Sequence, residues 1–142
     1  MIRQHPAIKL VSDNRYAGAT TESAYAASES LLLAQGAGKG EVQAVFAPNE
    51  SSTFGMLLAL DKAGLAGKVK FIGFDASEKL LAALKAEKIH GLLIQNPFQM
   101  GYVGVRAIVQ RLRGEKVAGV IDTGSTFVQR SDLEDPKVKA LL

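Results

Sequence analysis

The feature that most constrains this chain is a strand–helix–strand unit in residues 71–97, FIGFDASEKLLAALKAEKIHGLLIQNP. Two short runs of apolar residues flank a segment with helical spacing. Strands that are apolar throughout are typical of parallel sheets, because helices cover their faces. A parallel pair also needs a long crossover between its strands, and the helical segment provides one. The unit therefore predicts an α/β fold.

The same alternation of apolar strands and helices continues along the rest of the chain. Serine, threonine or proline residues begin the predicted helices, and glycines end several of them, as helix boundaries require. This pattern predicts one α/β domain with a three-layer, mainly parallel, flavodoxin-like sheet. The predicted strands are residues 8–12, 42–49, 69–75, 91–96 and 125–130, and the predicted helices are residues 20–36, 51–64, 77–88 and 97–115, with a turn and a frayed helix in 131–142.

Composition excludes several classes of protein. The chain has 142 residues, of which 47% are hydrophobic, but no apolar run approaches the length of a membrane span. The net charge of +3 comes from 17 basic and 14 acidic residues, and the densest basic cluster, in residues 106–116, contains no aromatic side chain. We therefore expect no nucleic-acid partner. The absence of cysteine excludes disulfides, thiolate catalysis and cysteine-based zinc sites.

Three motifs that resemble chemical sites fail on their context. The glycine-rich AQGAGKGEV lies between a helix and the following strand, the reverse of a phosphate loop, and Gly40 stands where that loop needs serine or threonine. His5 and His90 are far apart and lack carboxylate neighbours at metal-ligand spacing. Ser125 has no GxSxG context. We therefore predict no cofactor, no metal site and no catalytic nucleophile, and hence a protein that is not an enzyme.

Polar side chains follow the predicted strands at the points where those strands end. Since the carboxyl ends of parallel strands share one edge, which is where open α/β sheets bind ligands, we expect these side chains to converge. Amides donate and accept hydrogen bonds at once, and a carboxylate accepts from two hydroxyls. An aromatic ring can cover the C–H surface of a sugar. The set suits a neutral polyhydroxylated ligand, and its members are Asp13, Asn14, Arg15, Tyr16, Asn49, Glu50, Asp75, Gln95 and Asn96.

Each of these residues also has a purely structural interpretation. Asp75 can cap the following helix, with Glu78 three residues on to complete a capping box. Asn49 can stabilise the turn before the next helix, Gln95 can satisfy backbone groups at a strand end, and Tyr16 can serve packing. Taken singly, each residue fits the structural interpretation better. Their shared place at one edge favours a binding pocket in which Asp75 and Gln95 form two hydrogen-bonding walls.

The segments FAPN, GFDAS and QNPFQMGY, in this order and spacing, resemble the periplasmic sugar-binding proteins of ABC transporters, and the ribose-binding-like group most of all. The resemblance covers nearly the whole chain. It implies two α/β lobes joined by three crossing segments that close around a sugar and deliver it to a permease. It also implies that Asn49, Asp75 and Gln95 contact the sugar, with Tyr16 or a neighbour as the aromatic wall.

The resemblance covers only the C-terminal portion of such a protein. We expect residues 1–142 to be the C-terminal lobe without its first strand and helix, and residues 97–117 to be a segment that crosses to the N-terminal lobe. The N-terminus MIRQHPAIKL lacks the apolar region of a signal peptide, but Met1 resembles a fragment start. The expected location of the parent is therefore periplasmic or extracellular, with lipoprotein anchoring left open.

Other readings of the sequence remain open. The effector-binding core of a LacI-type transcriptional regulator has the same fold and would carry a DNA-binding segment upstream. A flavodoxin-like enzyme or a response-regulator domain would need a phosphate loop, or an acidic cluster with a lysine, at the strand ends, and neither is evident.

An apolar stripe on the predicted helix from Phe98 to Arg113 points to a further contact. Phe98, Tyr102, Val105, Val109 and Leu112 recur at spacings of four and three, and Ile108 widens the stripe. The resemblance implies that this helix packs on the N-terminal lobe. Without that lobe, we expect the helix either to fold back onto its own sheet or to be buried against a second copy. We favour the second outcome, a homo-oligomer of this chain.

Overall fold

The computed structural model describes residues 4–142 and contains a four-stranded mixed sheet. The strands lie in the order β1 (Ala44–Phe46), β2 (Lys70–Phe74), β3 (Gly91–Gln95) and β4 (Ser125–Val128). The pairs β1–β2 and β2–β3 are parallel, and β4 runs antiparallel to β3. The predicted α/β class with a mainly parallel sheet is confirmed.

Helices separate the parallel strands as predicted, and their caps explain where they begin and end. The helix α1 (Thr21–Ala34) begins after Thr20, whose side chain forms a capping box with Ser23, and it is followed by Gly36 at a φ of 63°. The remaining elements are α2 (Glu50–Lys62), α3 (Glu78–Lys85), α4 (Pro97–Leu112), α5 (Pro136–Lys139) and the 3₁₀ turns η2 (Ala37–Lys39) and η3 (Arg130–Asp132).

The core lies between the sheet and the helices α2 and α3. Phe71 of β2 and Leu92 of β3 are fully buried there against Leu60 of α2 and Leu80 of α3. The helix α1 packs along α2, where Gly55 permits the close approach. A Cβ at Gly55 would lie 2.6 Å from the Cβ of Ala24. These contacts make α1, α2, α3 and the sheet one packed unit.

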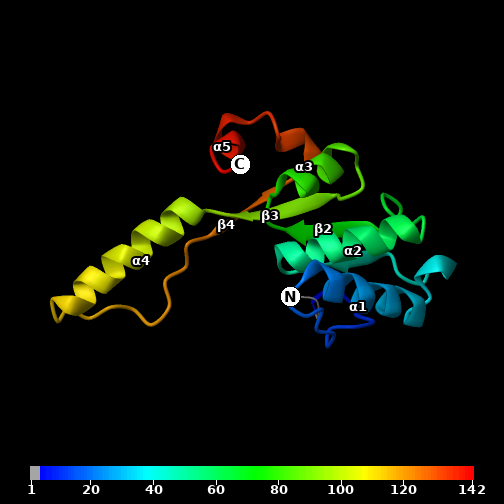
Figure 1. Cartoon of the computed structure of the whole chain (residues 1–142), viewed down its shortest axis with the longest axis horizontal. Helices are drawn as coiled ribbons and strands as arrows, with labels where there is room; N and C mark the ends of the chain where they lie inside the picture. The colour runs from blue at the N-terminus through cyan, green and yellow to red at the C-terminus, as the bar shows by residue number, and fades with distance from the viewer. Residues whose placement is uncertain (1–3) are drawn as a thin grey trace.

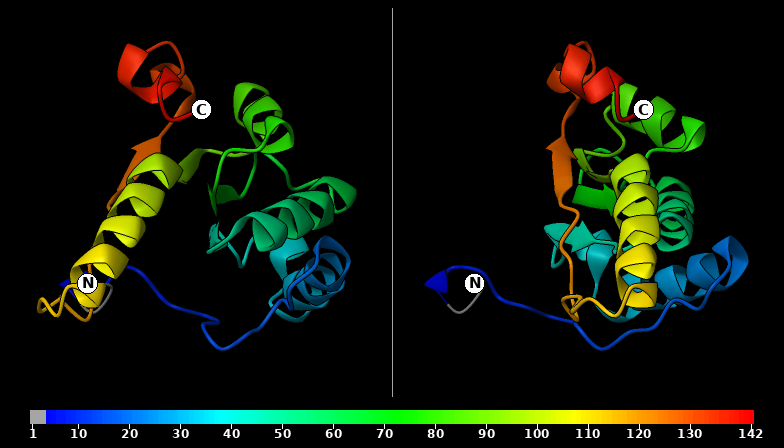
Figure 2. Two further views of the ribbon diagram at one scale, coloured as in Figure 1. Left: turned by 60° about the vertical axis from the view of Figure 1, so that its left-hand side comes forward. Right: turned by 90° about the vertical axis from the view of Figure 1, so that its left-hand side faces the viewer.

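The helices α1, α2 and α3 all lie on one side of the sheet (Figure 2). The strand order follows the chain order, so successive right-handed crossovers place their helices on the same face. The opposite face carries half-exposed side chains such as Phe46 and Phe127. Residues 4–142 thus form two of the three expected layers, and no helix of this part covers the second face.

The predicted strand at residues 8–12 is wrong. The segment is irregular and pairs with no other strand of residues 4–142, and its side chains Ile8, Leu10 and Val11 are about half exposed. Figure 2 shows the N-terminal segment running away from the sheet. Apolar alternation gives a strand only where a neighbouring strand can accept its backbone hydrogen bonds, and this segment has none beside it.

The helix α4 projects away from the sheet, and residues 113–124 return alongside it to β4 (Figure 1). None of its residues is buried, so the helix does not fold back onto its own sheet. Phe98 and Tyr102 stack with ring centroids 6.4 Å apart, and both side chains are more than half exposed. The apolar stripe is therefore present as predicted and is open to solvent.

Within residues 4–142, every helix is too short or too polar to cross a membrane.

Candidate functional site

Asn49 lies where the chain leaves β1 and enters α2. Its Oδ1 accepts hydrogen bonds from the backbone N–H of Ser52 at 2.9 Å, from the Ser52 hydroxyl at 2.8 Å and from the Ser51 hydroxyl at 3.1 Å. The side chain is thus the N-cap of α2, so the structural interpretation of Asn49 holds. Because its oxygen is fully used, the two N–H donors of the amide are the groups that Asn49 can offer to a ligand.

Asp75 follows β2 and has an unusual backbone conformation. Its φ is 68°, which few residues other than glycine adopt, and its N–H donates to the carbonyl of Leu93 at 2.9 Å. Gln95, at the end of β3, donates from Nε2 to the Asp75 carboxylate at 2.8 Å. The helix α3 has Ser77 as its N-cap, without a side-chain hydrogen bond. Asp75 is therefore not a helix cap, and the structure brings Asp75 and Gln95 together.

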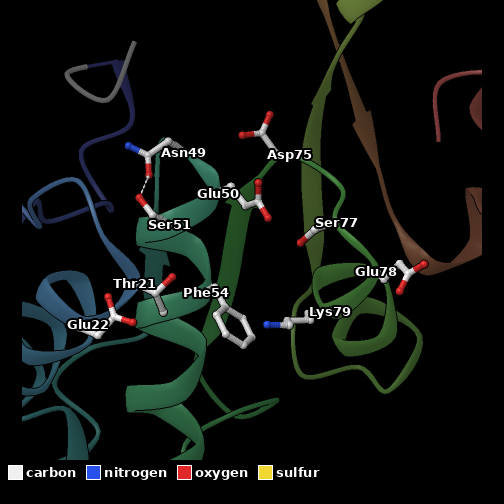
Figure 3. Close-up of a pocket in the computed structure, with 10 residues that line it drawn as sticks. All are labelled: Thr21, Glu22, Asn49, Glu50, Ser51, Phe54, Asp75, Ser77, Glu78 and Lys79. Atoms are coloured by element: carbon white, nitrogen blue, oxygen red, sulfur yellow. Dashed lines mark hydrogen bonds between the residues drawn. The ribbon is translucent and has the colours of Figure 1, made fainter.

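An open groove of about 750 Å³ runs along this edge of the sheet. Figure 3 shows Asn49 and Asp75 at the same end of the groove, with Phe54 and Lys79 further along it. Gln95 reaches the site through Asp75. Tyr16 lies outside the groove and is 95% exposed, because its segment does not join the sheet. The lining residues are Thr21, Glu22, Asn49, Glu50, Ser51, Phe54, Asp75, Ser77, Glu78 and Lys79.

The charges of the groove are mainly negative. Its carboxylates are those of Glu22, Glu50, Asp75 and Glu78, and Lys79 is the one cation among the lining residues. Lys79 Nζ lies 4.9 Å from the centroid of the Phe54 ring, in cation–π geometry. A hydrogen bond from its own backbone N–H, and then one from the Thr20 side chain, holds the pKa of the Glu22 carboxyl below its ordinary value. The groove therefore disfavours anions.

Sequence reasoning did not single out Phe54 and Lys79 as groove residues. Phe54 lies four residues after Glu50 and therefore one helical turn along the same face of α2. This spacing could have identified Phe54 from the sequence, because Glu50 is among the residues expected at the carboxyl edge of the sheet. Lys79 lies in the first turn of α3 and enters the groove only because α2 and α3 are neighbours on one face of the sheet.

No cluster of three metal-ligating side chains is present among residues 4–142. The polar groups that line the groove are amide, hydroxyl, carboxylate and ammonium groups, and none of them forms a nucleophile–base pair. These groups can donate to and accept from a polar ligand by hydrogen bonds.

A lobe of parallel strands with a polar groove at their carboxyl ends is the architecture of a solute-binding lobe. Residues 1–116 match the family described as "Periplasmic binding protein domain", and the chain belongs to this family. The identification made from its sequence motifs is confirmed.

Several individual proteins are similar to this chain in sequence or in structure. The ribose import binding protein RbsB of Haemophilus influenzae is 38% identical over 94 residues, which cover 66% of this chain and 30% of that protein. A solute-binding protein from Agrobacterium vitis with bound D-fucose aligns with a TM-score of 0.84 and 29% identity, over 99% of this chain and 47% of that one. A carbohydrate transporter protein from Agrobacterium radiobacter in complex with D-arabinose aligns with a TM-score of 0.81 and 35% identity, over 97% and 45% of the two chains.

The chain spans less than half the length of each of these proteins.

Proposed function

We propose that this chain is the sugar-recognising lobe of an ABC transporter solute-binding protein and that its groove binds a neutral sugar. The observation that carries the proposal is that two kinds of hydrogen-bonding group line one end of the groove. Asn49 has two amide N–H donors there, and the Asp75 carboxylate, an acceptor, is held by Gln95 Nε2 at 2.8 Å. A sugar hydroxyl donates one hydrogen bond and accepts others, so adjacent hydroxyls can satisfy a donor and an acceptor together.

The charge of the groove supports a neutral ligand over a phosphorylated one. The four carboxylates outnumber the single ammonium group, which already lies over an aromatic ring. A phosphate placed here would face like charges at short range. The relatives named for ribose import and those with bound D-fucose and D-arabinose support the same ligand class.

In the complete protein, a second lobe closes the groove from the other side. Residues 97–117 cross to that lobe, with hinges near Gln95–Pro97 and near residues 122–124. The projection of α4 away from its own sheet supports this role. The closed protein then delivers the sugar to a membrane permease from a periplasmic or extracellular location. Tyr16 reaches the sugar only if contacts with the second lobe of the complete protein order its segment.

Import by a transporter is favoured here over sugar sensing by a LacI-type regulator. The curated relatives that match this chain are ribose import binding proteins, at 33–42% identity over the aligned residues.

For the chain as it stands, we propose a homo-oligomer through residues 98–113. The stripe exposes Phe98 by 79%, Val105 by 64% and Leu112 by 82%. Several large apolar side chains exposed side by side on one helix are typical of an interface. Within residues 4–142, α4 has no buried residue.

A titration followed by NMR tests sugar binding, because it detects the weak affinity expected of half a pocket, with a Kd of about 1 mM or weaker. D-ribose should shift the signals of the Asn49 side-chain amide, Asp75 and Gln95, and D-ribose 5-phosphate should shift them less. Asp75→Asn should weaken ribose binding by about tenfold or more, since it removes a charged acceptor. Asp61→Asn is the matched control, because Asp61 pairs with Lys88 on the surface away from the groove.

Ribose shifts that are absent, or that are unchanged in Asp75→Asn, would contradict the proposal.

A further inference from the structure

Thr53, in the first turns of α2, is fully buried although it carries a hydroxyl. That hydroxyl makes two hydrogen bonds. It donates to the carbonyl of Asn49 at 2.7 Å and accepts from the backbone N–H of Phe74 at 2.9 Å. The first contact is a common local bond within a helix, but the second joins residues 21 positions apart. Asn49 is itself a groove residue, and Phe74 is the last residue of β2, directly before Asp75.

The second hydrogen bond extends the pairing of β1 and β2 beyond the point where β1 ends. The register between the two strands stops at Phe46 and Ile72, and the last backbone bond runs from the N–H of Ala47 to the carbonyl of Ile72 at 3.1 Å. The next N–H of β2 on this side belongs to Phe74, and the Thr53 hydroxyl is its acceptor. The Thr53 hydroxyl thus accepts the hydrogen bond that a longer β1 would accept.

Gly73 makes room for this contact. A Cβ at Gly73 would lie 2.2 Å from Cγ2 and 3.0 Å from Oγ1 of Thr53. The backbone of β2 can therefore approach α2 this closely only with glycine at that position, as is common where a backbone lies against another element. Thr53 and Gly73 are a matched pair from separate elements.

From these contacts we infer that Thr53 is a positioning residue, whose hydroxyl sets the spacing of Asn49 and Asp75 across the sugar groove proposed above. One end of the bridge is the backbone of Asn49 itself, and the other is the residue directly before Asp75. Because the hydroxyl is buried and both of its bonds are short, the two ligand-binding side chains are held before a ligand arrives. Such preorganisation raises affinity by lowering the ordering cost of binding.

The test compares Thr53→Val, which replaces the hydroxyl with a methyl group, with Thr53→Ser, which keeps the hydroxyl. Ile89→Val is the control for general loss of packing, because Ile89 is buried and precedes β3 at the opposite end of the sheet. Amide hydrogen exchange at Phe74 should accelerate about tenfold or more in Thr53→Val. It should change little in Thr53→Ser or Ile89→Val. Line broadening on the microsecond–millisecond scale should appear at Asn49 and Asp75 in Thr53→Val alone.

Ribose binding gives the second readout. Thr53→Val should weaken the affinity for D-ribose about five- to tenfold, whereas Thr53→Ser and Ile89→Val should stay within about twofold of the original chain. If Thr53→Val fails to fold, Gly73→Ala disturbs the same bridge from β2 and should give the same exchange pattern at Phe74.

Equal exchange at Phe74 in Thr53→Val and Ile89→Val would overturn the inference, as would an unchanged ribose affinity in Thr53→Val. If the original chain shows no response to ribose at all, the proposed sugar site fails instead. The positioning role of Thr53 is then tested by amide exchange at Phe74 and by line broadening at Asn49 and Asp75, because neither measurement needs a ligand.

Discussion

The conformation of Asp75 allows its structural and its ligand-binding roles to be separated by two substitutions. At a φ of 68°, a left-handed backbone costs a residue with a Cβ about 1–2 kcal/mol, and glycine escapes this cost. Asp75→Ala and Asp75→Gly both lose the hydrogen bond from Gln95, which contributes about 0.5–1.5 kcal/mol. Asp75→Ala keeps the backbone strain, but Asp75→Gly relieves it.

Asp75→Gly should therefore be more stable than Asp75→Ala by about 1 kcal/mol, after allowance for the greater freedom of glycine in the unfolded chain. For a chain of this length, that difference raises the melting temperature by about 4 °C. Thermal unfolding followed by circular dichroism, with urea unfolding as a check, measures it. Both variants should fold and should lose most of the response to D-ribose.

An Asp75→Ala variant as stable as Asp75→Gly would refute this reasoning, because it would mean that the left-handed conformation is not that of the folded chain. A ribose affinity unchanged in both variants would leave Asp75 without a role in binding.

Three further predictions concern other parts of the fold. Gly55→Ala should destabilise the chain by about 1–3 kcal/mol in urea unfolding, since the added methyl meets α1 at 2.6 Å, and Gly101→Ala in open space should not. Light scattering at high micromolar concentration should show a dimer or larger species that Val105→Glu plus Val109→Glu makes monomeric; a monomer in both cases would exclude self-association. Burial, and then the charge of Lys70, lowers the pKa of His90, so its contribution to stability is complete above about pH 6.5 and is lost as the pH falls. Urea unfolding should show a free energy of unfolding that is lower at pH 5 than at pH 7.5, and this fall should be smaller in His90→Gln than in the original chain.

The sequence predicted most of the sheet because its strands carry their own signals. Residues 71–74 of β2 and 91–94 of β3 are continuous apolar runs that end at polar residues, so the parallel pairing of these strands and their shared edge followed from local pattern alone. The meeting of Asp75 and Gln95 could be predicted for the same reason. The left-handed backbone of Asp75 could not, because aspartate tolerates several conformations and only the neighbouring strand selects one.

The predictions that failed or changed depended on partners outside the local pattern. Residues 8–12 have the composition of a strand, but in the described part of the chain no strand lies beside them, and Tyr16 stays exposed with them. Within residues 4–142, no second layer of helices covers the opposite face, because successive crossovers place α2 and α3 on the same side. Lys79 enters the groove through packing of α2 with α3, a relation that the sequence pattern does not contain, whereas the spacing of Phe54 from Glu50 could have placed Phe54 there.

The most direct test of the account is a crystal structure of this chain soaked with D-ribose at a concentration well above the Kd from the NMR titration. We predict electron density for one sugar in the groove, with hydroxyl oxygens within hydrogen-bond distance of the Asn49 amide nitrogen and the Asp75 carboxylate. An empty groove at that concentration, or a sugar bound only elsewhere on the chain, would contradict the account.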